Sequence, residues 1–167
     1  MPSLARRRTG RDKNLVGFTI ADVHYAVDIK RVREIIRPLA LVPIPHAPPA
    51  ILGVADYRGE VVPVLDVRRR FALPTVEPTR RTKWIVVEMG RRLAGLVVDS
   101  VTEVFGKSDA DRRAVPELGV GDAARGIQAV YPYEGSLVFV IDVDRIAAVA
   151  DVLDLSALGR GLVEEKR

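Results

Sequence analysis

Cysteine is absent from the 167 residues, which excludes disulfides, thiol nucleophiles and thiolate metal ligands together. Histidine occurs only at His24 and His46, in separate segments, so a zinc site is not expected. No run of 18 apolar residues, as a membrane-spanning helix requires, is present. The segment after Met1 is charged and has no secretory signal pattern. We therefore expect a cytoplasmic protein with no cofactor and no metal.

Motifs of catalysis and phosphate binding are also missing. The chain has no G-x-S-x-G, P-loop or G-x-G-x-x-G, and Gly119-Val120-Gly121 lacks the further glycine and the strand–helix context of a phosphate site. Asp66 and Asp142 could form a catalytic pair, but each lies where a predicted strand gives way to a helical turn. There an Asp side chain accepts free backbone N–H groups. We favour this capping role, extend it to Asp28 and Asp99, and expect no catalytic residues and no enzymatic activity.

Positive charge is confined to one end of the chain. The formal net charge is +4, but residues 1–13 hold five basic residues against Asp12, and the remainder has 21 basic and 21 acidic residues. This composition predicts a disordered basic tail over residues 1–13, which could touch anionic surfaces. A small barrel that stacks nucleic-acid bases on its aromatic residues is a remote alternative, because only nine aromatics, Trp84 among them, are available.

Short apolar segments separated by Gly- and Pro-containing turns predict an all-β protein. Strands are expected within Leu15–Ile20, Val23–Ile29, Leu41–Ile44, Val54–Tyr57, Glu60–Val67, Lys83–Glu88, Leu93–Phe105, Ile127–Tyr131 and Leu137–Val143. Short helices or helical turns are expected within Lys30–Ile36, Pro49–Gly53, Arg68–Leu73 and Asp144–Leu153. Pro63 cannot donate to a ladder, which predicts an edge strand or a bulge at Glu60–Val67. Residues 106–126 are expected to form a long polar loop.

The two halves of the chain echo each other. Residues 14–36 and 83–105 each predict a strand, a turn and a strand ending in Val-Asp. Each half also ends in an apolar strand that runs into Asp-Val-x-Arg, at 66–69 and 142–145. The echo predicts two similar small barrels, because closing short strands into barrels protects their edges.

Four segments in order resemble the CheW family of chemotaxis coupling proteins. They read FTIADVHYAVDIKRVREI, PPAILGVADYRGEVVPVLDVRRRF, RRLAGLVVDSVTEV and LVFVIDVDRI, and the most specific part runs from Gly53 to Asp66. The resemblance covers residues 14–150. It implies two intertwined five-stranded SH3-like β-barrel subdomains with a few short helices, a groove between the barrels and a C-terminal helix. We expect residues 151–167 to be a helical extension with a fraying end.

The resemblance also implies a function. CheW-like proteins are non-catalytic adaptors that couple the cytoplasmic tips of chemoreceptors to the regulatory domain of a CheA-like histidine kinase, within a receptor array. From the resemblance, the receptor-binding residues would be Val32, Glu34, Arg58, Val101 and Val104, and the kinase-coupling residues Gly53 and Gly95. From its turn position alone, Arg58 is either a solvated arginine or an anchor for a partner carboxylate.

The sequence departs from the family pattern beside the expected receptor contact. Asp56-Tyr57 replaces the usual Asn-Leu before Arg-Gly, Ser100 replaces a usual glycine, and the stretch from Gly126 to Tyr133 also differs. Asp56 could pair with Arg58. These departures leave open a divergent paralogue that binds only one partner and modulates or sequesters it.

Overall fold

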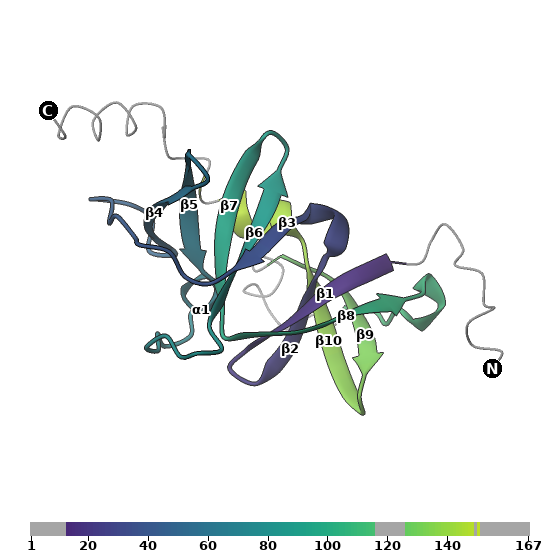
Figure 1. Ribbon diagram of the computed structural model, residues 1–167. Coiled ribbons are helices and arrows are strands. Elements are labelled where there is room, and N and C mark those ends of the chain that lie inside the picture. The colour runs from purple at the N-terminus through teal and green to yellow at the C-terminus, as the bar shows by residue number, and fades with distance from the viewer. Residues whose placement is uncertain (1–12, 116–125, 149, 151–167) are drawn as a thin grey trace, which may run out of the picture.

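The computed structural model of the protein describes residues 13–115, 126–148 and 150 (Figure 1). Residues 1–12 of the predicted tail, the Gly119–Gly121 segment and residues 151–167 of the predicted extension lie outside this part. Short helical segments are η2 (Ile29–Arg31), α1 (Val67–Arg70), η3 (Asp109–Asp111) and α3 (Val143–Ala147). The strands are β1 (Lys13–Ile20), β2 (Val23–Asp28), β3 (Val32–Ile36), β4 (Ile51–Tyr57), β5 (Glu60–Asp66), β6 (Lys83–Met89), β7 (Arg92–Val98), β8 (Ser100–Lys107), β9 (Ile127–Tyr133) and β10 (Ser136–Ile141).

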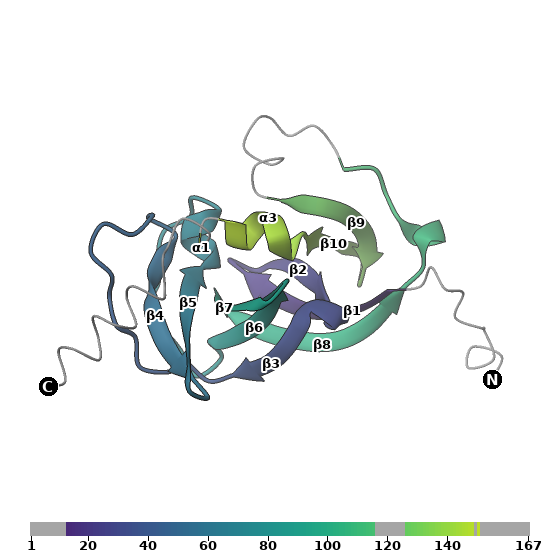
Figure 2. The ribbon, with the colours of Figure 1, turned by 90° about the horizontal axis from the view of Figure 1, so that it is seen from above.

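The strands form two five-stranded sheets that exchange segments between the halves of the chain. The first sheet has the order β8-β1-β2-β10-β9, and the second has the order β3-β6-β7-β5-β4. Each sheet therefore combines a hairpin from one half with three strands from the other, and the chain crosses between sheets after β2 and after β7 (Figure 2). The all-β, intertwined two-subdomain fold predicted from the sequence is confirmed.

The internal repeat extends to the register of individual residues. Val64 pairs with Gly95 in the second sheet, and the equivalent pair in the first sheet is Val140 with Ala26. The bridge from Val42 to Val54 beside β4 likewise matches the bridge from Arg113 to Val130 beside β9. Because the third strands β3 and β8 are exchanged reciprocally, the two halves are related by an approximate two-fold rotation.

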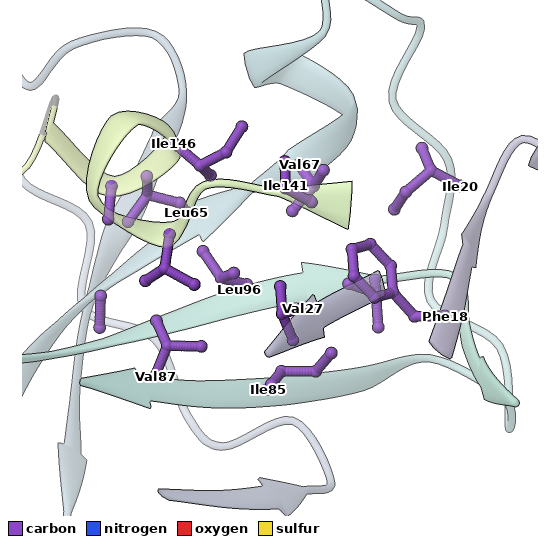
Figure 3. Close-up of a cluster of buried hydrophobic side chains, with 14 of the residues drawn as sticks. Phe18, Ile20, Val27, Leu65, Val67, Ile85, Val87, Leu96, Ile141 and Ile146 are labelled. Carbon is purple, nitrogen blue, oxygen red and sulfur yellow. The ribbon is translucent and has the colours of Figure 1, made fainter. Parts of the chain in front are cut away.

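The apolar core has a central cluster, one further cluster within the first sheet and two within the second. The central cluster lies between the sheets and beneath the short helices (Figure 3), and includes Val16, Phe18, Ile20, Val27, Leu65, Ile85, Val87, Leu96, Ile141 and Ile146. Neighbouring residues of the same strands face the other way, as Leu15 does toward Tyr131 and Trp84 toward Val64. Central strands thus bury both faces, which explains their nearly continuous apolar sequences.

Side chains on the two edge strands of each sheet contact each other and close the sheet into a barrel. In the first sheet, the rings of Phe105 on β8 and Tyr133 on β9 lie 4.8 Å apart, although these strands are at opposite edges. In the second, the hydroxyl of Tyr57 on β4 donates to Glu34 on β3 over 2.7 Å. The Tyr133 hydroxyl makes the matching bond to Glu103 on β8 over 2.6 Å. One Tyr–Glu hydrogen bond therefore joins the edges of each barrel.

Several local predictions were wrong. The helix expected over Lys30–Ile36 is the 3₁₀ turn η2 followed by strand β3, because a spacing of four residues between Val32 and Ile36 fits one face of a strand as well as a helix. The helical turn expected over Pro49–Gly53 is absent: residues 49–50 form a hydrogen-bonded turn, and β4 begins at Ile51.

The strand that holds Pro63 is also not the predicted edge strand, because β5 lies between β4 and β7. The parallel ladder between β5 and β7 begins only at Val64, so it does not require an N–H group from Pro63. The observed bulge lies on the partner strand β4, between Ile51 and Gly53.

Asp66 and Asp142 cap short helices, as the sequence predicted. Asp66 accepts from the Arg68 amide at the start of α1, and Asp142 accepts from the amides of Asp144 and Arg145 at the start of α3. Asp28 caps η2 in the same way. Asp99 does not cap a helix, because the chain passes directly from β7 into β8 at this point.

Candidate functional site

A polar cluster at one end of the second barrel brings together Glu34 and Arg58. The guanidinium of Arg58 binds Glu34 through Nη2 at 2.6 and 3.0 Å and through Nε at 3.2 Å. The Tyr57 hydroxyl donates to the same carboxylate, and the Arg58 guanidinium lies 5.6 Å from the centre of the Tyr57 ring. Two residues predicted separately from the sequence thus form one ion pair, and Tyr57 contacts both partners of that pair.

The turn that carries Arg58 has the geometry of a tight hairpin. Arg58 and Gly59 have φ values of 51° and 85°, as a two-residue turn of this kind requires. Asp56 accepts from the Gly59 amide over 2.8 Å and so stabilises the turn from within. The expected pairing of Asp56 with Arg58 is therefore wrong, since Arg58 points instead to Glu34.

The electrostatics of this cluster favour its charged form. Hydrogen bonds from Arg58 and then Tyr57 lower the pKa of Glu34, and the Glu34 carboxylate raises the pKa of Arg58. Burial, followed by the bond to Glu34, raises the pKa of Tyr57. The Arg58 side chain is nevertheless 70% exposed, so its guanidinium is oriented by Glu34 while remaining open to a partner.

The predicted apolar contact residues lie on the two exchanged edge strands, β3 and β8. Val32 and Val101 are half-buried and pack against the same central cluster, so the structure brings both beside the junction of the two barrels. Val104, at 57% exposure, has the most open side chain of the predicted set of valines. Sequence reasoning missed Ile35, an exposed apolar residue on β3 whose equivalent in the repeat is Val104.

The two predicted kinase-coupling glycines have different surroundings. Gly53 has a φ of 155° at the β4 bulge, and a side chain there would collide with the backbone of Val42 and Pro43. It thereby lets residues 41–43 lie close against β4, where Leu41 and Val42 are exposed. Gly95 lies inside the second barrel, and a Cβ atom there would meet Trp84 at an ordinary 3.7 Å.

The first barrel carries a second copy of the Tyr–Glu arrangement, which sequence reasoning did not find. Glu103 and Tyr133 are the repeat equivalents of Glu34 and Tyr57. Burial and then the bond to Glu103 raise the pKa of Tyr133 to about 12. The signal was present in the sequence as Val-x-Glu-Ile and Val-x-Glu-Val at 32–35 and 101–104, and as Tyr-x-Gly at 57–59 and 133–135.

Two further ion pairs fasten the crossings between the barrels. Arg68 of α1 binds Asp99 at the β7–β8 crossing over 2.6 and 2.9 Å, and Asp99 also accepts from the Ala21 amide. Arg31 at the β2–β3 crossing binds Asp144 of α3 and donates to the Glu88 carbonyl. Each crossing is thus tied to a short helix, with the charges reversed between the halves.

A cluster of metal-binding side chains is not present in the described part of the chain. Its residues include no group of three or more His, Asp or Glu side chains that could hold a metal ion. None of its helices is long and apolar enough to cross a membrane. The exposed features described above are instead a paired arginine and scattered apolar side chains, which are suited to contact with another macromolecule.

Comparisons with known proteins agree with this description. The model of the CheW-like domain family matches residues 14–151. Chemotaxis protein CheW of Rhizobium meliloti is 33% identical over 149 residues, covering 87% of this chain and 94% of that protein. Protein FrzA of Myxococcus xanthus is 37% identical over 107 residues, covering 64% of this chain and 66% of that protein.

A solved structure extends the similarity to three dimensions. The scaffolding protein TtCheW from Thermoanaerobacter tengcongensis superposes with a TM-score of 0.72 at 28% sequence identity, covering 78% of this chain and 88% of that one. None of these comparisons favours the nucleic-acid-binding barrel or the single-partner paralogue.

Proposed function

The chain belongs to the CheW-like family and has an adaptor role in chemotaxis signalling, and we propose that it joins chemoreceptors to a CheA-like histidine kinase. It acts in the cytoplasm, by binding and without chemistry of its own. The match of the family model to residues 14–151 is the observation that carries this proposal.

The receptor-facing surface we propose consists of Val32, Glu34, Arg58, Val101 and Val104. Receptor tips are helical, and a helix bound to a shallow surface needs a few apolar anchors bordered by charges. The valines of β3 and β8 supply the anchors. The exposed guanidinium of Arg58, already oriented by Glu34, supplies a charged contact that loses little conformational freedom on binding.

The kinase-facing surface we propose includes the segment that Gly53 holds against β4. Leu39, Leu41 and Val42 are each more than a third exposed, and such side chains gathered on one segment are typical of a protein contact. Gly53 acts there through backbone position rather than by touching the kinase. Gly95 acts from the barrel interior, because its position on β7 is buried.

A sedimentation assay with a receptor cytoplasmic fragment and a CheA-like kinase tests this function. The wild-type protein should enter the complex and raise kinase flux when the receptor is present. Arg58→Glu places a second carboxylate beside Glu34 and should abolish receptor binding while kinase binding persists. Arg80→Glu, the same charge change on a distant exposed segment, is the matched control. A wild-type protein that binds neither partner would contradict the proposal, and unaltered binding by Arg58→Glu would remove Arg58 from the receptor surface.

A further inference from the structure

The approximate two-fold relation between the barrels creates an ambiguity for any partner that lies across both. Rotation about that axis exchanges Val32 with Val101 and Ile35 with Val104, so the apolar anchors look alike from either direction. The Tyr–Glu bonds are exchanged as well. A helical partner guided by these groups alone could lie across the surface in two opposite directions.

Charge breaks this symmetry at one pair of turn positions. Arg58 in the β4–β5 turn has Glu134 as its equivalent in the β9–β10 turn, each followed by a glycine and each with a positive φ, 51° and 46°. These two turns lie at opposite ends of the molecule (Figure 1). Glu34 is therefore paired with an arginine at one end. At the other end the matching turn carries a further exposed acid, while Lys107, whose ammonium group lies over the Tyr133 ring, donates to the Pro132 carbonyl.

We propose that Glu134, with Glu103, forms a second, acidic contact point on the receptor-facing surface, and that the opposition of Arg58 and Glu134 fixes the direction in which the helical partner lies. This inference rests on the proposed receptor binding. The partner segment carries an acidic side chain where it meets Arg58 and a basic side chain where it meets Glu134. The Tyr133–Glu103 bond orients one of the two carboxylates, as the Tyr57–Glu34 bond does in the other barrel.

Binding of a fluorescently labelled receptor cytoplasmic fragment tests the acidic contact. Glu134→Arg should weaken binding about fivefold or more, because an attractive exposed pair becomes a repulsive one. Arginine fits this turn, since Arg58 has the same conformation in the other barrel. Glu77→Arg, an equal change of charge on the exposed 74–82 segment, should change binding less than about twofold. Equal melting temperatures would show that both variants fold.

Direction is tested with a nitroxide label at one end of the same fragment. In the wild-type protein the label should broaden amide resonances near only one of the two turns. In the double variant Arg58→Glu/Glu134→Arg, whose charges are interchanged, broadening should move to the other turn. An unchanged direction, or undiminished binding by Glu134→Arg while Arg58→Glu binds weakly, would overturn the inference and leave the proposed function standing. A wild-type protein that does not bind the fragment would instead overturn the proposed function, and this inference with it.

Discussion

The two barrels share a backbone plan but differ in charge. Strand order, register and the Tyr–Glu bond between edge strands are the same in both. Two charged positions change sign between the repeats, since Arg58 is matched by Glu134 and Arg68 by Asp144. The comparison teaches that the apolar alternation sets the fold, whereas the charges make the two ends of the molecule different. Each barrel can therefore serve as an internal control for the other.

The largest expected effect comes from two glycines of the second barrel that the first barrel replaces by alanine. Gly53 and Gly95 have alanines, Ala129 and Ala26, as their repeat equivalents. Gly53→Ala would force a side chain against the Val42 carbonyl at a φ of 155°, and should lower the free energy of unfolding by about 2–4 kcal/mol. Gly95→Ala meets only ordinary contacts and should cost less than about 1 kcal/mol.

Urea denaturation followed by tryptophan fluorescence measures the free energy of unfolding of both glycine variants. Trp84 reports on unfolding because it is buried in the second barrel beside Gly95. Equal stability of the two variants would show that residues 41–43 can move away from β4 at little cost. Kinase binding by the two variants is then measured under conditions where both are folded. Weaker binding by Gly53→Ala alone would assign the effect to the backbone position of Gly53 and not to a loss of folding.

The two ion pairs at the crossings between the barrels should differ by an intermediate amount in their contribution to stability. The Arg68–Asp99 side chains are 16% and 25% exposed, whereas those of Arg31 and Asp144 are 31% and 64% exposed. Arg68→Ala leaves the more buried carboxylate without its cation and should cost about 1–3 kcal/mol. Arg31→Ala should cost less, because water can solvate Asp144. The melting temperatures of the two variants show which ion pair contributes more to stability. A larger decrease for Arg31→Ala than for Arg68→Ala would contradict the prediction.

The smallest expected difference is in the loss of stability at low pH caused by Asp99 and by Asp144. Burial opposes ionisation of Asp99, but hydrogen bonds from Arg68 and the Ala21 amide outweigh it and lower the pKa of Asp99 below its ordinary value. The bond from Arg31 likewise lowers the pKa of Asp144. A lowered folded-state pKa gives stability that is complete above the unfolded value, about 4, and is lost as the pH falls through the folded value.

The pH dependence is measured by urea denaturation between about pH 2 and 6. Asp99→Asn should flatten the loss of stability below about pH 4, because the titrating carboxylate is gone. Asp144→Asn should flatten it less, in keeping with its greater exposure. Parallel curves for the wild type and Asp99→Asn would show that the Arg68–Asp99 pair contributes no pH-dependent stability.

Local chemistry made much of the fold predictable. The hairpin turns at Ala21-Asp22 and Arg58-Gly59, and the caps Asp66 and Asp142, depend on residues within a few positions of each other. Strand β3 was missed because the spacing of Val32 and Ile36 suits two secondary structures. The choice is made by pairing with β6, which lies about fifty residues further along the chain.

The candidate site was predictable in membership but not in arrangement. The family pattern identified Glu34 and Arg58 separately, whereas their ion pair depends on β3 and β4 meeting at the closure of a barrel. Asp56 looked like the nearer partner for Arg58, but its carboxylate is occupied by the Gly59 amide. The Tyr133–Glu103 bond joins residues 30 positions apart and becomes visible only when the repeat is aligned residue by residue.

The reciprocal exchange of strands also constrains how the molecule is made. The hairpin β1–β2 finds its neighbours only in β8 and β10, and β3–β5 find theirs only in β6 and β7. A nascent chain emerging from the ribosome therefore cannot complete either sheet from its first half alone. Its apolar N-terminal strands therefore lack their sheet partners until nearly all of the domain has been synthesised, and such non-local strand pairing slows folding.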